Sequence, residues 1–161
     1  MEENFDVAIV GAGPAGISAA CLLAEKGFKT IVFERGEYPG AKNISGGVLY
    51  GHDLAQVIPD YEGKNCPIER NIIESRLWVL SRDGGYSLAY RDRIFKGERK
   101  NNSFTVGRAK SDRWFAEQAR ARGALVVCGT GVTDLLRDIH QRVVGVRTDR
   151  ADGEGTGLSV S

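Results

Sequence analysis

The sequence has little of what marks several large classes of protein. Its formal net charge over 161 residues is +1, so we expect no electrostatic attraction to nucleic acid. No apolar run approaches the roughly 20 residues of a membrane-spanning helix, and the longest runs have the length of a strand. The acidic first residues, Met-Glu-Glu-Asn, do not resemble a signal or transit peptide, and we expect neither. These absences favour a globular protein without a transmembrane segment.

Cysteine and histidine are too few and too scattered to build a metal or disulfide site. The three cysteines, Cys21, Cys66 and Cys128, are odd in number and far apart, which excludes a disulfide framework and a Cys-x-x-Cys knuckle within this chain. The two histidines, His52 and His140, have no neighbours that would complete a metal site or a catalytic triad. We therefore predict no metal site, no iron–sulfur ligands and a reducing, cytoplasmic location.

Glycine is the one residue present in unusual number. The 21 glycines gather mainly in residues 11–16, 36–51, 84–85 and 123–157. The first two clusters are predicted to carry the function, whereas the other two have the pattern of turns.

The first glycine cluster lies inside a predicted βαβ unit. The apolar residues 5–10 predict a strand buried on both faces. Residues 17–26, rich in Ala and Leu and ending before Gly27, predict a helix, and residues 29–34 predict a second buried strand. Strand, glycine turn, helix and strand within about thirty residues indicate a right-handed βαβ unit.

The rest of the chain is predicted to alternate between short strands and helices. Residues 35–51 are predicted to form a loop, because they are dense in Gly, Asn, Ser and Pro. Ser111 is the predicted N-cap of a helix from Asp112 to Arg122. The other predicted elements are a helical turn at 54–58, a hairpin of 76–80 and 86–90 around Asp83-Gly84-Gly85, a connection at 91–102, strands at 104–107 and 125–128, and a meander of 132–136 and 143–148.

The segment between the first strand and the first helix matches the dinucleotide-binding pattern Gly-x-Gly-x-x-Gly. Gly11 permits a tight turn, Gly13 lets the backbone approach a pyrophosphate, and Gly16 lets the helix pack near the sheet. The positive end of the following helix then points at the phosphates. The predicted cofactor-binding residues of this loop are Gly11, Ala12, Gly13, Pro14, Ala15 and Gly16.

An acidic residue ends the second strand. Glu34 lies 18 positions past Gly16, where a carboxylate accepts hydrogen bonds from the hydroxyls of an adenosine ribose. The carboxylate would repel a 2′-phosphate, which disfavours NADP even though Arg35 follows. Glu34 alone does not separate NAD from FAD. We predict that Glu34 and Arg35 both lie at the cofactor.

Two stretches of the sequence resemble known flavoproteins. Residues 5–34 resemble the FAD fingerprint of the family that includes glutathione reductase and hydroxybenzoate hydroxylase. Residues 37–50, Glu-Tyr-Pro-Gly-Ala-Lys-Asn-Ile-Ser-Gly-Gly-Val-Leu-Tyr, are more specific. They resemble a loop of the electron-transfer flavoprotein–quinone oxidoreductases, above all the bacterial FixC-type branch, which is linked to nitrogen fixation and carnitine metabolism. Later stretches agree at 67–70, 106–115 and 144–150, so the resemblance spans residues 5–154.

The resemblance implies an α/β fold with a Rossmann-like FAD-binding βαβ domain of the glutathione reductase and hydroxybenzoate hydroxylase type. An antiparallel β region is expected as an insertion. We expect residues 1–50 and 104–154 to form the FAD-binding domain, residues 51–103 an inserted β region on the substrate or quinone side, and residues 155–161 an atypical tail. Full-length relatives are longer, so the resemblance also implies a C-terminally truncated chain.

The resemblance adds four predicted cofactor-binding residues. The loop at 37–50 is expected to approach the flavin, with Ser45 and Gly46 beside the ring. Arg108 is expected to reach FAD near its ribose and pyrophosphate, since a guanidinium pairs phosphate oxygens bidentately. Val132 matches the position whose backbone meets the adenine ring. No catalytic acid or base is predicted, because flavin chemistry needs mainly position and electrostatics from the protein.

The implied function is that of an FAD-dependent oxidoreductase. It would take electrons from an electron-transfer flavoprotein and pass them toward quinone or a ferredoxin-like partner. Peripheral contact with the inner face of a membrane is expected only of a full-length parent, and the fragment alone is expected to be inactive. Two alternatives stay open: a geranylgeranyl-reductase-like flavoprotein, and a non-catalytic nucleotide-binding fragment.

Overall fold

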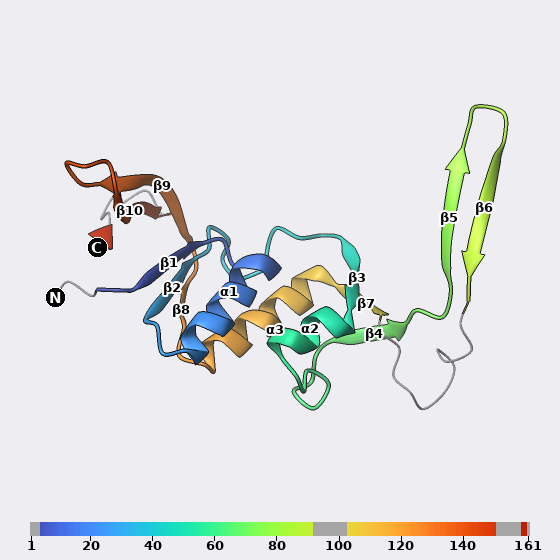
Figure 1. Cartoon of the computed structure of the whole chain (residues 1–161), viewed down its shortest axis with the longest axis horizontal. Coiled ribbons are helices and arrows are strands. Elements are labelled where there is room, and N and C mark those ends of the chain that lie inside the picture. The colour runs from blue at the N-terminus through green and yellow to red at the C-terminus, as the bar shows by residue number, and fades with distance from the viewer. Residues whose placement is uncertain (1–3, 92–102, 151–158, 161) are drawn as a thin grey trace. The chain divides into compact units, whose positions relative to one another are not determined.

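The structure is a computed structural model that describes residues 4–91, 103–150 and 159–160 (Figure 1). It divides into two units. Unit 1 comprises Met1–Ser45 and Arg108–Ser161, and unit 2 comprises Gly46–Gly107. The predicted connection at 91–102 and the predicted tail at 155–161 fall almost entirely outside the described residues.

A three-stranded parallel sheet forms the centre of unit 1. Its strand order is β1-β2-β8, with β1 at Val7–Val10, β2 at Thr30–Phe33 and β8 at Leu125–Val127. The helix α1 (Pro14–Glu25) joins β1 to β2, and these three elements form the predicted βαβ unit. A second helix, α3 (Arg108–Arg120), packs beside α1 (Figure 1).

The two strands of the βαβ unit differ in burial. β2 is buried along its whole length because it is the central strand of the three. β1 lies at the edge of this sheet, and its Val10 is 60% exposed, so the prediction that this strand is buried on both faces is wrong. The apolar composition of the segment indicated a strand but not its place in the strand order.

The α3 helix begins four residues earlier than predicted. Ser111, which was expected to cap a helix starting at Asp112, lies inside the first turn, and its Oγ donates to the carbonyl oxygen of Arg108. A serine hydroxyl bonds a backbone carbonyl one turn back within a helix as readily as it caps a helix end. Because α3 starts at Arg108, directly after β7 ends at Gly107, no residue between the two elements is left to cap the helix.

A small antiparallel sheet completes unit 1. The strands β9 (Thr130–Arg137) and β10 (Val143–Arg150) form the predicted meander, and β11 (Ser159–Val160) pairs with β10. Val146 of β10 packs in the same buried cluster as Phe33 of β2, so the meander contributes to the core of this unit.

Unit 2 contains a second antiparallel sheet, in the order β3-β7-β4. Its strands are β3 (Gly46–Tyr50), β7 (Ser103–Gly107) and β4 (Ile68–Asn71), and the short helix α2 (Gly51–Val57) follows β3. The prediction of a loop through residue 51 is therefore wrong at its C-terminal end. The glycines of β3 suggested a turn, but pairing of Gly46 with Gly107 and of its neighbours with β7 makes this segment a strand.

The predicted hairpin forms the rest of unit 2. β5 (Ser75–Leu80) and β6 (Gly85–Tyr90) pair antiparallel, with Leu77 opposite Leu88 and Val79 opposite Tyr86. All twelve residues of the two strands are exposed.

Candidate functional site

The glycine-rich loop connects β1 to α1 at the carboxyl edge of the parallel sheet. Gly11 has a φ of +98°, and its N–H donates to the carbonyl oxygen of Phe33 at 2.8 Å. A Cβ on Gly16 would lie 2.1 Å from the carbonyl oxygen of Gly11, so only glycine fits there. The loop thus makes the tight turn and the close helix–sheet approach that the sequence pattern predicts.

The N-terminus of α1 is open to an anion. Gly13 is its N-cap residue, no side chain caps the helix by a hydrogen bond, and its first turn holds no acidic residue. A Cβ on Gly13 would meet nothing within 4 Å, and the φ of −78° is one that any residue adopts. The fold of the chain therefore gives no reason for glycine at this position, whereas close backbone approach to a pyrophosphate does. The loop fits the diphosphate of a dinucleotide.

Glu34, the first residue after β2, joins the glycine loop to the neighbouring strand ends. Its Oε2 accepts a hydrogen bond from the N–H of Ala12 at 2.9 Å, and its Oε1 accepts one from the N–H of Gly36 at 2.8 Å. The backbone N–H of Glu34 donates to the carbonyl of Val127, and its carbonyl accepts from Thr130. A carboxylate offers about four acceptor positions, so the two used here leave capacity for ribose hydroxyls.

Two cavities share Glu34 and Arg35 as lining residues. The loop-side cavity has a volume of about 170 Å³ and the strand-side cavity a volume of about 230 Å³. The loop-side cavity is lined by Ala12, Gly13, Glu34, Arg35, Gly40, Lys42, Asn43 and Asp112. The strand-side cavity is lined by Val10, Gly11, Phe33, Glu34, Arg35, Thr130, Gly131 and Val132. The glycine loop and Glu34 contribute to both, so the two cavities lie on either side of one carboxylate.

Arg108, at the start of α3, is held by the helix itself. Its Nε donates to Oδ1 of Asp112 at 3.1 Å, and its Nη2 donates to Oδ2 at 2.9 Å. The amide of Asn43 also donates to Oδ2 of Asp112, at 2.6 Å. The hydrogen bonds with Asp112 raise the pKa of Arg108 above its ordinary value, although partial burial opposes this, so the guanidinium keeps its charge.

The loop after Glu34 packs closely on α3. Gly40 has a φ of +87°, and a Cβ on it would lie 3.0 Å from both the Cα of Ala109 and the Cβ of Asp112. The guanidinium of Arg113 lies 4.6 Å from the centre of the Tyr38 ring, within cation–π range. Only glycine allows the backbone this close to the helix, so the loop is fixed beside the loop-side cavity.

The structure brings most of the predicted site together. The loop at 11–16 adjoins Glu34 and Arg35, and Val132 lines the strand-side cavity. Arg108 does not line either cavity but binds Asp112, which does. Ser45 is exposed, and its carbonyl accepts from the N–H of Arg108 at 3.1 Å. The part of these residues in cofactor binding stays a prediction.

One predicted residue falls in the other unit. Gly46 begins β3 of unit 2, where it pairs with Gly107. Four residues that line the loop-side cavity are not among the predicted cofactor-binding residues: Gly40, Lys42, Asn43 and Asp112, of which the first three belong to the loop at 37–50. The sequence does contain a signal for Asp112. It follows Arg108 by four positions, and an arginine and an acid at that spacing lie next to each other on the same face of a helix.

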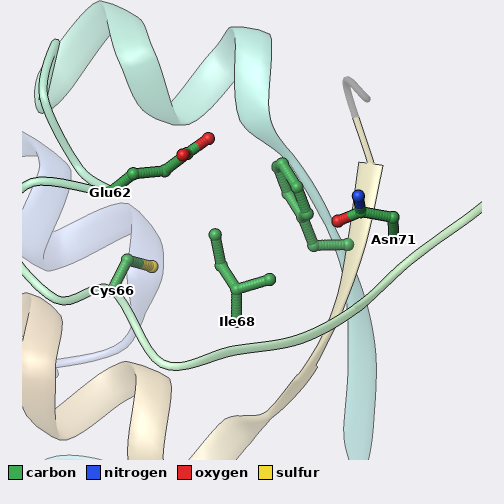
Figure 2. A pocket seen from close by; sticks show the side chains of 5 residues that line it. Glu62, Cys66, Ile68 and Asn71 are labelled. Carbon is green, nitrogen blue, oxygen red and sulfur yellow. The ribbon is translucent and has the colours of Figure 1, made fainter. Parts of the chain in front are cut away.

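Unit 2 has a separate cavity of about 300 Å³, lined by Glu62, Cys66, Ile68, Asn71 and Phe104. In Figure 2, the side chain of Ile68 is seen between those of Cys66 and Asn71. Burial, and to a lesser extent the charge of Glu62, raises the pKa of the Cys66 thiol to about 11. The sulfur is therefore protonated near neutral pH and is a poor nucleophile.

The described parts of the chain offer neither a metal cluster nor a membrane-spanning helix. They contain no group of three or more His, Cys, Asp or Glu residues that could hold a metal ion. None of their helices has both the length and the apolar character needed to cross a membrane.

The glycine loop, the open helix and the acid after β2 define a dinucleotide-binding fold. A family model described as FAD dependent oxidoreductase matches residues 6–101, and the chain belongs to this family. The FixC protein of Bradyrhizobium diazoefficiens is 45% identical over 154 residues, which cover 96% of this chain and 35% of that protein. The FixC protein of Escherichia coli K12 is 40% identical over 150 residues, 92% of this chain and 34% of that protein. The predicted resemblance to FixC-type flavoproteins is confirmed.

Solved structures confirm the predicted fold class. A geranylgeranyl bacteriochlorophyll reductase-like protein from Thermoplasma acidophilum superposes with a TM-score of 0.77 at 20% identity, over 99% of this chain and 38% of that one. The myxobacterial FAD-dependent halogenase CndH superposes with a TM-score of 0.75 at 22% identity, over 98% of this chain and 35% of that one. The family assignment also confirms FAD as the cofactor. This chain spans about a third of the length of the FixC proteins that it matches.

Proposed function

We propose that this chain holds the adenosine and pyrophosphate half of FAD. We further propose that the whole protein passes electrons from an electron-transfer flavoprotein toward quinone or a ferredoxin-like partner. The first proposal rests on the open N-terminus of α1, where Gly13 faces free space beside Glu34. The second rests on the 45% identity with a FixC protein.

The proposal divides the contacts with FAD among several of the predicted site residues. Backbone N–H groups after Gly13 bind the pyrophosphate, Glu34 accepts from the ribose hydroxyls, and the backbone at Val132 meets the adenine. Arg108 neutralises phosphate charge, while Ser45 lies toward the flavin. FAD, when bound, would supply the ring that accepts electrons and passes them on.

A substitution of Gly13 tests the proposed pyrophosphate site directly. Gly13→Val would place two methyl groups where the pyrophosphate has to approach, and FAD binding should be abolished. Gly84→Val is the matched control, since a Cβ on Gly84 also meets nothing within 4 Å but lies in the turn of the hairpin. FAD and NAD are titrated into the full-length protein with each substitution. Unchanged FAD affinity in Gly13→Val, or tighter binding of NAD than of FAD, would contradict the proposal.

A turnover assay tests the proposed electron path. The full-length protein is mixed with FAD, a reduced electron-transfer flavoprotein and a quinone analogue, and oxidation of the donor is followed by absorbance. Steady oxidation is expected for the full-length protein. We propose that the 161-residue chain alone gives none, because it spans only 35% of its FixC relative.

The same assay separates the alternative functions. The likeness to a reductase-like protein at 20% identity concerns the fold, so it gives no reason to prefer isoprenoid reduction. Reduction of a geranylgeranyl group with no response to the electron-transfer flavoprotein would favour that alternative. FAD binding without any turnover by the full-length protein would favour a non-catalytic role.

A further inference from the structure

Asp112 is a buried carboxylate next to the proposed pyrophosphate site. It is 3% exposed, lines the loop-side cavity and lies on α3, one turn after Arg108. A buried charge is costly unless it is paired and hydrogen-bonded. Asp112 meets this condition with three donors, two on Arg108 and one on Asn43.

The hydrogen bonds between Asp112 and Arg108 fix the plane of the guanidinium. Nε and Nη2 form one edge of the fork, and each binds a different oxygen of the carboxylate. Nη1 has no hydrogen-bond partner among the described residues, and the side chain is 33% exposed. One edge of the guanidinium is thus occupied, and the remaining donors are free for a second acceptor.

Asn43 in turn fixes the orientation of the Asp112 carboxylate. Its amide donates to the same Oδ2 that accepts from Nη2 of Arg108, and Asn43 belongs to the loop that Gly40 seats against α3. The orientation of Asp112 is therefore set from two sides, by its own helix and by the loop.

We propose that Asp112 is a positioning residue that presents the free donors of Arg108 to the FAD pyrophosphate. The inference rests on the proposed function, because it requires that Arg108 contacts FAD. A free arginine side chain loses much rotamer freedom when it binds a ligand. Asp112 removes that freedom when the protein folds, so less is lost when the cofactor binds.

The test is a double-mutant cycle on FAD affinity in the full-length protein. Asp112→Asn keeps the volume but removes the charge and turns one acceptor into a donor, and it should raise the Kd for FAD about tenfold. In an Arg108→Ala background the same change should have little further effect, because the residue that Asp112 positions is gone. Glu117→Gln is the matched control: it removes an acid from the same helix, and the partner there is Arg120. The Kd of the Glu117→Gln variant for FAD should equal that of the unsubstituted protein.

Arg108→Lys provides an independent arm that leaves Asp112 intact. Lysine keeps the positive charge but lacks the fork that Asp112 holds, so the Kd for FAD should rise about as much as in Asp112→Asn. The melting temperature of each apoprotein is recorded to show that the variants are folded.

The outcomes separate the two proposals. Failure of the unsubstituted full-length protein to bind FAD would overturn the proposed function and with it this inference. Normal FAD binding that neither Asp112→Asn nor Arg108→Lys weakens would overturn the inference alone. The inference would also be overturned if Asp112→Asn lowered FAD affinity by the same factor in the Arg108→Ala background as in the unsubstituted protein. Asp112 would then act only on the fold.

Discussion

Two β structures in this chain have similar composition and opposite surroundings. β2 consists of Thr30, Ile31, Val32 and Phe33, and all four are buried. The hairpin of β5 and β6 also contains many large apolar residues, yet Leu80 is 74% and Leu88 is 67% exposed. Composition therefore predicts that a segment is a strand much better than it predicts what covers the strand.

The hairpin has one distinctly apolar face. Because side chains alternate along a strand, Leu77 and Val79 of β5 share a face with the residues opposite them in β6. The large apolar residues exposed on this face are Leu77, Val79, Tyr86, Leu88 and Tyr90. A two-stranded hairpin on its own is at best marginally stable in water. The stability of the described chain should thus come from the sheet in unit 1 rather than from this hairpin.

The largest effect predicted for a single substitution compares the two regions directly. Phe33→Ala should lower the free energy of unfolding by about 3–5 kcal/mol, because it opens a cavity beside β2 in the core. Tyr86→Ala removes an aromatic ring from the exposed hairpin face and should change the same quantity by less than about 0.5 kcal/mol. Urea denaturation followed by circular dichroism measures both. Equal losses would mean that the hairpin is as well packed as β2.

A smaller effect is expected at the end of β2. Glu34→Ala removes the acceptor of the Ala12 and Gly36 N–H groups, and the free energy of unfolding should fall by about 2 kcal/mol. FAD affinity should fall at least about tenfold, because the ribose hydroxyls lose the same acceptor. Glu37→Ala, an exposed acid three residues later, is the control and should leave both quantities unchanged. If Glu34→Ala binds FAD normally, the ribose contact is assigned wrongly.

The features that the sequence predicted have local signals. The βαβ unit follows from its glycine pattern, and the hairpin follows from Asp83-Gly84-Gly85 between two apolar runs. β3 was missed because it depends on pairing with β7, which lies much farther along the chain, and its glycines resemble a turn. The same holds for the site: Asn43 and Asp112 are hydrogen-bonded across 69 positions of sequence, a contact that no short motif encodes.

A double substitution tests whether the apolar hairpin face needs its hydrophobic character. Leu77 and Leu88 lie directly opposite each other, so Leu77→Glu with Leu88→Lys forms a cross-strand ion pair. The free energy of unfolding should change by less than about 1 kcal/mol, and self-association measured by light scattering should decrease.

The matched pair in unit 1 is Ile9 and Val32, which are partners in the parallel ladder. Ile9→Glu with Val32→Lys puts charges at a strand pair of which Val32 is fully buried, and the chain should fail to fold. If the hairpin variant unfolds as well, the face has a packing partner and the contrast between the two regions does not hold.

The smallest predicted effect concerns Cys66 in the cavity of unit 2, which we compare with the exposed hairpin of the same unit. The pKa of Cys66 is raised to about 11, first by burial and second by Glu62, so its thiolate is scarce at pH 8. Glu62→Gln removes only the second cause, and alkylation of Cys66 by iodoacetamide at pH 8 should accelerate no more than about threefold. Glu69→Gln, another acid in unit 2, is the control and should leave the rate unchanged.

The raised pKa of Cys66 also sets the sign of a pH effect. In the unfolded chain the thiol loses its proton near its ordinary value of 9.0, whereas in the native state it keeps the proton until about pH 11. The native state thus binds more protons between these values, and stability should fall as pH rises from 9 to 11. Cys66→Ser should reduce this fall when urea denaturation is repeated across that range. An acceleration of alkylation much larger than threefold in Glu62→Gln would mean that the charge of Glu62, and not burial, controls the thiol, and that this cavity is nearly as open to solvent as the hairpin.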